Sequence, residues 1–591
     1  MAQDKSKDTP RYSPMDPAEL FIRAPAQGHQ VVRALVDAMQ PQNLDPLNLG
    51  DAFMSVSLDM MRNPAKVASA QVELAHDYFR LCQSFAQKAA GLPAEPVVEP
   101  EPGDRRFRDP DWEQNPIFDF VKQSYLLTSN WINRQVESVE DLDEAHAKKV
   151  RFYTRQFTDA IAPTNFVPTN PAVLRETTQT RGANLLRGMR NLLNDLDFET
   201  GKLNIAMTDK SAFEVGHNVA TTPGKIVYQT DIFQLIQYEP RTDRQHRVPL
   251  LIFPPWINKY YILDLKPENS FIRWALDQGH SVFVVSWVNP DERLAQKTWE
   301  DYLNEGVLEA VDAVTRAAGH DRVNAIGYCI GGTLLASALA YMAAKGDERI
   351  KMATFFAAQV DFSAPGDLEV FIDEQQLDNL DRMMSEKGYL EAQTMSTSFN
   401  MLRSNDLIWT FVINNYLMGK DPYPFDLLYW NADSTRMPRE LHMFYLREMY
   451  LHNRLSQPGG LKLNGVDIDL GRIEIPIYLQ ASRDDHIAPY TSVFKAAALY
   501  SGPVRFALAG SGHIAGVINP PAANKYCHWL NDEAPDQLDH WLAGAQEHKG
   551  SWWPDWHAWT EPQLEGQVAA RHPTNGPFDV IEDAPGSYVK Q

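Results

Sequence analysis

The spacing of hydrophobic positions divides the chain into two parts with different periods. From residue 31 to about residue 205, apolar residues recur at helical spacing, interrupted by a Pro- and Glu-rich stretch at 91–103 that neither a helix nor a central strand tolerates. From about residue 206, apolar runs of strand length alternate with helical patterns. The pattern therefore predicts a helical N-terminal part followed by an α/β part.

The predicted strands of the second part are nearly continuous apolar runs, as expected for a sheet that helices cover on both faces. Strands and helices alternate with short connections, which predicts right-handed crossovers and a doubly wound, mostly parallel sheet. The predicted strands are residues 225–230, 232–238, 248–255, 281–287, 323–328, 350–358, 475–480 and 504–508.

The alternation of strands and helices stops at about residue 361 and resumes after residue 470. The intervening segment is far longer than an ordinary loop, so we expect a folded cap over the sheet. The predicted organisation is a disordered segment at 1–30, a helical N-terminal domain at 31–205, a catalytic domain at 206–361 and 471–560, a cap at 362–470, and a polar C-terminal tail at 561–591.

Composition narrows the class of protein. A formal net charge of -22 argues against a general nucleic-acid-binding protein. The three cysteines, Cys82, Cys329 and Cys527, are widely separated, so no zinc site or disulfide framework is expected. The first residues lack the apolar core of a signal peptide, and no run reaches the roughly 18 apolar residues of a transmembrane helix. We expect a cytoplasmic protein without a transmembrane segment.

Gly327-Tyr-Cys-Ile-Gly331 follows a predicted strand and precedes a predicted helix. This is the G-x-S-x-G nucleophile elbow with Cys329 in place of serine. Glycines relieve crowding at the strained turn, and the first helix amides, beginning with that of Ile330, are free to stabilise an oxyanion. A buried structural thiol in an ordinary turn is the alternative that the pattern alone leaves open.

The residues after two later strands complete a catalytic set. Asp485 and His486 follow the strand 475–480, and His513 lies in a glycine-rich loop after the strand 504–508. An order of nucleophile, acid and histidine, each at a strand end, is that of the α/β-hydrolase arrangement. We therefore expect Cys329, Asp485 and His513 to meet, with His486 in a supporting position.

A second oxyanion donor is expected from the loop after the strand 248–255. Pro254 and Pro255 have no N–H, so the candidates are the amides of Trp256 and Ile257, and we favour Ile257. A thiolate attacks thioesters readily, so Cys329 favours thioester exchange with CoA or a carrier thiol as the leaving group.

The elbow and several other segments resemble the polyhydroxyalkanoate synthase family, and length and motifs resemble its class I type. The resemblance covers roughly residues 105–560. It implies an α/β-hydrolase fold and an acyltransferase that polymerises (R)-3-hydroxyacyl-CoA, mostly 3-hydroxybutyryl-CoA, with release of CoA and no cofactor. The matching segments are 109–116, 253–265, 286–290, 327–332, 405–409, 427–435 and 511–516.

The same resemblance implies roles for individual residues. Cys329 corresponds to the nucleophile that holds the growing chain as a thioester, and His513 corresponds to its base. Asp485 corresponds to the carboxylate assigned to activating the incoming 3-hydroxyl, with orientation of His513 as the alternative. Residues expected to contact substrate or to set the pocket width are Trp430, Arg403, His486 and Trp256.

Expected partners are the growing polyester and its granule surface, a second copy of the chain, and granule-associated proteins, with the enzyme at the granule surface in the cytoplasm. Two alternatives remain: a thioesterase or esterase of the same fold, and a binding scaffold with a vestigial elbow. We expect the tryptophan cluster 552–559 to pack internally, and the arginines at 105, 106 and 108 to be solvated or salt-bridged.

Overall fold

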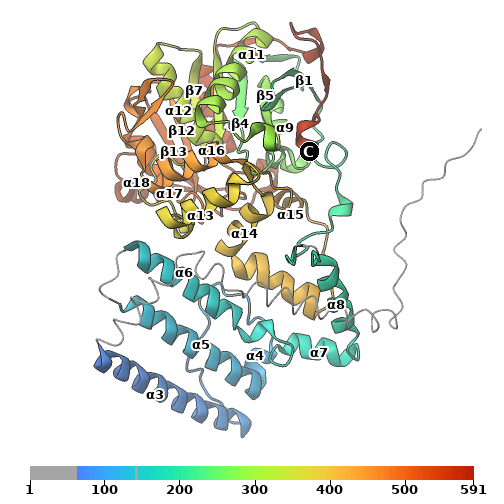
Figure 1. Cartoon of the computed structure of the whole chain (residues 1–591), viewed down its shortest axis with the longest axis vertical. Coiled ribbons are helices and arrows are strands. Elements are labelled where there is room, and N and C mark those ends of the chain that lie inside the picture. Colours follow the sequence, from blue (N-terminus) through green and yellow to red (C-terminus); the bar gives the residue numbers. More distant parts are fainter. Residues whose placement is uncertain (1–62, 140–143, 199) are drawn as a thin grey trace, which may run out of the picture.

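The computed structural model describes residues 63–139, 144–198 and 200–591. The segment 1–30, expected to be disordered, lies outside the described residues. Figure 1 shows a layer of N-terminal helices at one end of the molecule and the sheet with its covering helices at the other, with part of the cap between them.

From residue 63 on, helices form within the predicted helical part, whose residues 31–62 lie outside the described residues. Asn115 begins α5 by accepting a hydrogen bond from the amide of Ile117 (3.0 Å), and Pro116 occupies the first helical position. Helices α3, α5 and α6 pack side by side (Figure 1). The helices of this part are α3 (Pro64–Ala89), α4 (Asp111–Gln114), α5 (Pro116–Glu137), α6 (Glu144–Ala160), α7 (Pro171–Gln179) and α8 (Ala183–Asp195).

The main sheet has eleven strands among the described residues, in the order β15-β14-β13-β12-β7-β6-β4-β5-β2-β1-β17. The six strands from β13 to β5 are parallel, and the strands beyond them on both sides are antiparallel. The strands are β1 (Gly224–Gln229), β2 (Phe233–Tyr238), β4 (Leu250–Phe253), β5 (Val282–Trp287), β6 (Val323–Tyr328), β7 (Ile350–Phe356), β12 (Ile477–Ser482), β13 (Val504–Ala509), β14 (Cys527–Leu530), β15 (Gln546–Lys549) and β17 (Glu582–Asp583).

The strand order reverses next to β4. The chain passes from β4 to β5 on one side and then returns to place β6 on the other side. A crevice at the carboxyl ends of the strands forms at such a reversal. In this protein the crevice lies where β4 ends at Phe253 and β6 ends at Tyr328, immediately before Cys329.

Helices cover the sheet as the apolar strands require, since β4, β5 and β6 are buried along their whole length. A π-helical segment interrupts the helical stretch 299–318, and in it Gly306 lies against the ring of Trp287. The helices of this part are α9 (Phe271–Asp277), α10 (Trp299–Asp301), the π segment Tyr302–Leu308, α11 (Glu309–Ala318), α12 (Ile330–Lys345), α17 (Tyr490–Lys495), α18 (Leu538–Gly544) and α19 (Trp553–Thr560).

The segment 362–470 is mostly helical, and its strands pair with each other outside the main sheet. Its elements are α13 (Glu374–Ser385), β8 (Tyr389–Leu390), α14 (Ala392–Leu402), the π segments Asn405–Trp409, Val412–Leu417 and Tyr445–Leu451, α15 (Asp426–Asn431), β9 (Met437–Pro438), α16 (Arg439–Phe444), β10 (Leu461–Leu463) and β11 (Val466–Ile468).

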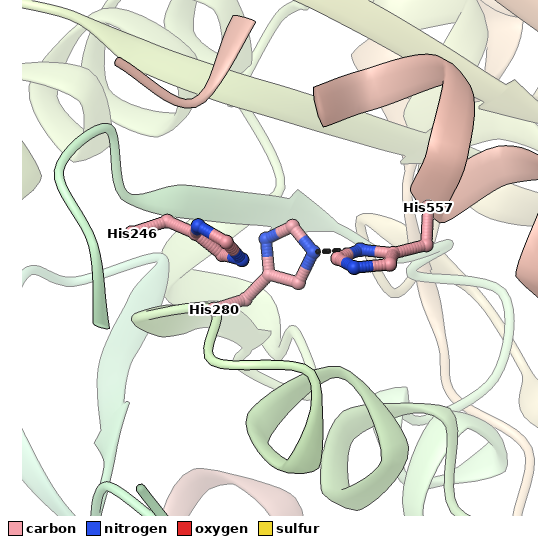
Figure 2. A group of neighbouring side chains, drawn as sticks. All are labelled: His246, His280 and His557. Carbon is pink, nitrogen blue, oxygen red and sulfur yellow. Dashed lines mark hydrogen bonds between the residues drawn. The ribbon is translucent and has the colours of Figure 1, made fainter. Parts of the chain in front are cut away.

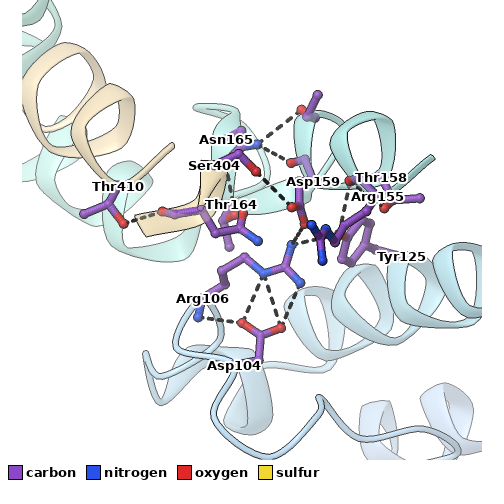
Figure 3. Close-up of polar contacts among 12 residues, drawn as sticks. Asp104, Arg106, Tyr125, Arg155, Thr158, Asp159, Thr164, Asn165, Ser404 and Thr410 are labelled. Atoms are coloured by element: carbon purple, nitrogen blue, oxygen red, sulfur yellow. Dashed lines mark hydrogen bonds and ion pairs between the residues drawn. The ribbon is translucent and has the colours of Figure 1, made fainter. Parts of the chain in front are cut away.

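A polar network joins the N-terminal helices to this segment (Figure 3). Arg106 pairs with Asp104 (2.9 Å) and with Asp159 of α6 (3.0 Å). The other carboxylate oxygen of Asp159 accepts a buried hydrogen bond from the hydroxyl of Ser404 (3.1 Å), just beyond α14. The salt-bridged state expected for Arg106 is confirmed, and the pairing links a residue of the first helices to the cap.

The C-terminal residues differ from the expected polar tail. β17 pairs with β1 at the edge of the main sheet, β16 (Gln567–Ala569) pairs with β3 (Arg244–His246), and Val589 is buried. Strands of two or three residues are too short to produce a hydrophobic period, so the sequence pattern did not reveal them. The internal packing expected for the tryptophan cluster is confirmed by the burial of Trp552, Trp553 and Trp556.

Candidate active site

Cys329 occupies a strained turn between β6 and α12. Its backbone has φ 51° and ψ -126°, outside the regions that residues with side chains prefer. A Cβ on Gly331 would lie 2.4 Å from the carbonyl oxygen of Phe253, and one on Gly327 would lie 2.4 Å from the Cα of Gly332. The glycines therefore allow the turn to press against the end of β4, which places the thiol at the crevice.

Asp485 and His513 meet as the order of motifs predicts. His513 Nδ1 lies 2.7 Å from Asp485 Oδ2, and the Asp485 side chain is fully buried. The other oxygen, Oδ1, accepts hydrogen bonds from the amides of Ile487 (2.8 Å) and Ala488 (2.9 Å). Both carboxylate oxygens are thus engaged, and His513 is held with its second ring nitrogen directed away from Asp485.

The loops that carry these two residues are joined because β12 and β13 are parallel neighbours. Beyond the paired strands, the amide of Arg483 donates to the carbonyl of Ala509 (2.8 Å), and the amide of Asp484 donates to the carbonyl of Ser511 (2.9 Å). Tyr328 of the elbow donates its hydroxyl hydrogen to the carbonyl of His513 (3.3 Å). The carboxyl ends of the parallel strands therefore bring the elbow and the loops of Asp485 and His513 together.

The environment of His513 favours the imidazolium. Burial of the ring works against protonation, but the charge of Asp485 opposes it, and interactions with the Cys329 side chain and the hydrogen bond to Asp485 add to this effect. Together they hold the pKa of His513 well above its usual value. A proton taken from the Cys329 thiol is therefore stabilised on this ring.

The residues expected to donate to the oxyanion lie at the start of α12 and in the wall of the cavity that contains Cys329. Ile330 is the first residue of α12, where backbone amides have no partner within the helix. Ile257 lines the same cavity as Cys329. The close approach of Gly331 to the carbonyl oxygen of Pro254, 2.6 Å from a Cβ built on the glycine, brings the loop after β4 against the start of α12.

A mostly apolar cavity of about 360 Å³ contains Cys329 and His513. Its walls come from the loops at the end of the main sheet and from the segment 362–470. Trp430 is buried in the wall, where its ring N–H donates to the carbonyl of Lys259 (2.7 Å), and Arg403 is paired with Asp406 (2.6 Å). The apolar side chains in the wall include Met395, Phe399, Leu407, Leu427, Leu428 and Ile514.

His486 also lines this cavity, beside the buried Asp485. Burial lowers the pKa of His486 to about 4, so the imidazole is neutral at physiological pH. Its buried Nδ1 has no hydrogen-bond partner among the residues that the structure describes. The unpaired ring nitrogen is therefore buried within the wall and is not exposed to the cavity.

Trp256 is the expected pocket residue that the structure does not bring to the cavity. Its side chain is 2% exposed and packs behind the loop against Trp287, Trp299 and Tyr302, with ring centroids 5.0 to 5.9 Å apart. The proline-rich loop turns the ring into the core, and Ile257 takes the position beside the thiol. The expectation that Trp256 sets the pocket width is therefore wrong as a direct contact.

Sequence reasoning missed two contributions to the site. Tyr328 stands at a variable position of the elbow motif, so only its contact with His513 reveals its role in holding the histidine loop. The amides of Ile487 and Ala488 bind Asp485 through the backbone, which leaves no trace in side-chain identity.

The fold and the cavity define an α/β-hydrolase-fold protein whose nucleophile elbow carries a cysteine. Residues 251–520 match the family described as "alpha/beta hydrolase fold", and residues 103–275 match "Poly-beta-hydroxybutyrate polymerase (PhaC) N-terminus". The expected α/β-hydrolase fold is thereby confirmed.

Curated relatives match almost the whole chain. A "Poly(3-hydroxyalkanoate) polymerase subunit PhaC" of Rhizobium meliloti (strain 1021) is 47% identical over 99% of this chain and 97% of its own. A "Poly(3-hydroxyalkanoate) polymerase" of Methylorubrum extorquens is 49% identical over 90% and 88%, and the PhaC subunit of Cupriavidus necator is 42% identical over 89% of both chains. The protein belongs to the poly(3-hydroxyalkanoate) polymerase family and is an acyltransferase of poly(3-hydroxyalkanoate) synthesis.

The structure also tests the expected absence of a transmembrane helix in the described residues. Over residues 63–139, 144–198 and 200–591, no helix has the length and apolarity needed to cross a bilayer.

Proposed function

We propose that this enzyme polymerises (R)-3-hydroxyacyl-CoA, with 3-hydroxybutyryl-CoA as the main substrate, and that Cys329 carries the growing chain as a thioester. The observation that supports this proposal is the alignment of Cys329, His513 and Asp485 at the crevice, under a cap that supplies apolar walls. The assignment to the class I type, without an accessory subunit, is part of the proposal.

In the acylation step, His513 accepts the proton of the Cys329 thiol, and the thiolate attacks the acyl carbonyl carbon of the CoA thioester. The amides of Ile330 and Ile257 stabilise the oxyanion of the tetrahedral intermediate. The bond between the carbonyl carbon and the CoA sulfur then breaks, and the departing thiolate takes the proton from His513. The acyl unit remains on Cys329, and free CoA leaves.

In the elongation step, the 3-hydroxyl oxygen of one unit attacks the carbonyl carbon of an acyl thioester. The new ester bond forms as the carbon–sulfur bond breaks, and the hydroxyl proton passes to a base. We assign that base to His513, because Asp485 is fully buried, lies outside the cavity wall and has both oxygens engaged. Asp485 then acts by orienting His513 and stabilising its charge.

The cavity beside the thiol has room for a short acyl unit. The cavity of about 360 Å³ is suited to a small apolar group, and CoA must extend beyond it. A larger cavity of about 1010 Å³, whose wall includes Arg190, Lys210 and several asparagines, shares the wall residues Ser396, Leu407 and Asn431 with it. This neighbouring space provides room for the polar part of the substrate. No cofactor is proposed, since the side chains supply the nucleophile, the base and the oxyanion donors.

The alternative, a thioesterase or esterase, differs in the acceptor that attacks the acylated cysteine. Water would release a monomeric acid, whereas a 3-hydroxyl forms polyester. The apolar cap favours the second outcome, because it restricts access of water to the thioester.

We further propose that the enzyme works as a homodimer at the surface of polyester granules in the cytoplasm. The described N-terminal helices expose large apolar side chains, among them Val72 (69% exposed) and Phe79 (62% exposed) on α3. These residues lie seven positions apart and so share one face of the helix. Such a face suits contact with an apolar polymer, a granule-associated protein or a second copy of the chain.

The test is measurement of CoA release and of products with (R)-3-hydroxyacyl-CoA substrates of increasing chain length. We expect polyester plus one CoA per unit, with the highest rate for the four-carbon substrate. Replacing Cys329→Ala should abolish turnover while leaving the circular dichroism spectrum unchanged. Monomeric acid as the product would support the thioesterase alternative, and unchanged CoA release by the variant would contradict the assignment of Cys329.

A further inference from the structure

A second group of functional side chains lies far from the cysteine. His246 of β3, His280 just before β5, and His557 of α19 converge at the end of the sheet where β5 begins (Figure 2). Strands β4, β5 and β6 are parallel, and Cys329 follows the carboxyl end of β6. Cys329 therefore lies at the opposite end of the strands from the three histidines. The histidines therefore take no part in the acyl-transfer site.

The three imidazoles have the geometry of a nearly assembled ligand set. One ring nitrogen from each histidine lies within 4.8 Å of the other two. His280 Nε2 and His557 Nδ1 are 3.1 Å apart, and the rings of His246 and His280 have centroids 4.9 Å apart. Nitrogens that bind a tetrahedral zinc ion at 2.0–2.1 Å are separated by about 3.4 Å, so small ring rotations complete the set.

The cluster is largely shielded from solvent. His280 is 1% exposed, and His246 and His557 are partly buried. Imidazole nitrogens are common ligands of zinc-type ions. A water molecule would supply the fourth ligand of a tetrahedral site.

The histidines also have ordinary hydrogen bonds that a packing role would explain. His280 bonds with His557, and His246 Nε2 lies 2.9 Å from the carbonyl oxygen of Gln278. These two contacts engage three of the six ring nitrogens. A carbonyl on the far nitrogen of a ligating histidine is also what metal sites use to orient the ring. The convergence of three separate chain segments on one point is what favours a metal site.

We propose that His246, His280 and His557 bind one divalent first-row metal ion of the zinc type. The ion would join α19 and the short strand β3 to the end of the sheet where β5 begins. Its role is structural, because the site lies across the sheet from Cys329 and fastens the C-terminal residues to the core. Imidazole nitrogens favour zinc, nickel, copper and cobalt over magnesium or calcium, which prefer oxygen ligands.

The experiment is titration of the tag-free, full-length protein with Co²⁺, followed by its visible absorption, and displacement of Co²⁺ by Zn²⁺. We expect saturable binding of one ion per chain and a rise in melting temperature on adding Zn²⁺. His557→Gln and His246→Gln should each weaken binding by at least about tenfold and remove the rise. Because both side chains are partly exposed, these variants avoid the fully buried His280.

Two controls distinguish this site from others. His540→Gln removes an exposed histidine elsewhere and should bind as the wild type does. Cys329→Ser removes the thiol of the acyl-transfer site, since a thiolate can also bind metal ions, and this variant should bind Co²⁺ as the wild type does. The proposal is overturned by the absence of saturable binding, by equal binding in His557→Gln and the wild type, or by binding that depends on Cys329. None of these readouts depends on polymerisation, so failure here is separate from failure of the proposed function.

Discussion

Asp485→Asn tests whether the buried carboxylate works through His513. In the wild type, Oδ2 accepts the hydrogen bond of His513 Nδ1, and Oδ1 accepts two backbone amides. Asparagine keeps its carbonyl oxygen on the two amides and turns its NH₂ group toward His513. Nδ1 must then act as the acceptor, so the proton of the neutral ring moves to Nε2, and the ring can no longer take a proton from Cys329.

The size of the effect follows from the loss of base catalysis. A positioned general base contributes about 10²- to 10⁴-fold, and the tautomer change in a serine protease triad costs about 10⁴-fold. A thiol depends less on its base than a hydroxyl does, because a thiolate forms more readily. We therefore expect kcat for CoA release to fall by about 10²- to 10⁴-fold, which corresponds to roughly 2.7–5.5 kcal/mol in activation free energy.

Two assays follow this change. CoA release reports turnover, and the rate of Cys329 alkylation by iodoacetamide reports the thiolate directly. The matched control is Asp484→Asn, at the exposed neighbouring position, which should leave both rates within about twofold of the wild type. If Asp485→Asn retained alkylation and CoA release within about threefold of the wild type, a role through His513 would be refuted.

Three further changes test other parts of the structure. Gly331→Ala would place a Cβ 2.4 Å from the carbonyl oxygen of Phe253 and so push the elbow away from the loop after β4. We expect kcat, measured by CoA release, to fall by about 10²-fold or more, because the oxyanion donors would be displaced. Ser404→Ala removes a buried donor from Asp159 and should lower unfolding free energy by about 1–3 kcal/mol and speed hydrogen exchange in α6, measured by denaturation and mass spectrometry. The pKa of His513 is raised in the folded protein, so protonation of this ring stabilises the fold. The stabilisation is complete below about pH 6.5, the ordinary pKa of histidine, and is lost as the pH rises through the raised pKa. The melting-temperature difference between wild type and Asp485→Asn should therefore be larger at pH 6 than at pH 10.

Each of these predictions has a control and a contradictory outcome. Gly576→Ala, where a Cβ meets nothing closer than 3.6 Å, should retain full activity; an active Gly331→Ala enzyme would show that the close approach is dispensable. Ser398→Ala removes a hydroxyl that bonds only within its own helix, so equal effects of the two serine substitutions would argue against the interdomain contact. A pH-independent melting-temperature difference would contradict the raised pKa.

The convergence of the proposed catalytic residues could be predicted because their signals are local. Cys329 stands in a five-residue motif, and Asp485 and His513 each follow an apolar run of strand length. Parallel strands have their carboxyl ends at one edge, so recognising the strands is enough to place these residues together. The structure brings Asp485 and His513 within hydrogen-bond distance and places the Cys329 thiol in the same cavity as His513.

Other features depended on contacts between residues distant in sequence. The amino-acid pattern by itself determined the helical and strand periods, the elbow, and the order of nucleophile, acid and base, because these follow from spacings of a few residues. Only the tertiary structure decided that Trp256 turns into the core and that Asp159 meets Ser404. It also decided that His246, His280 and His557 converge. Such pairings depend on how whole helices and strands pack, and no period along the chain encodes which side chains then become neighbours.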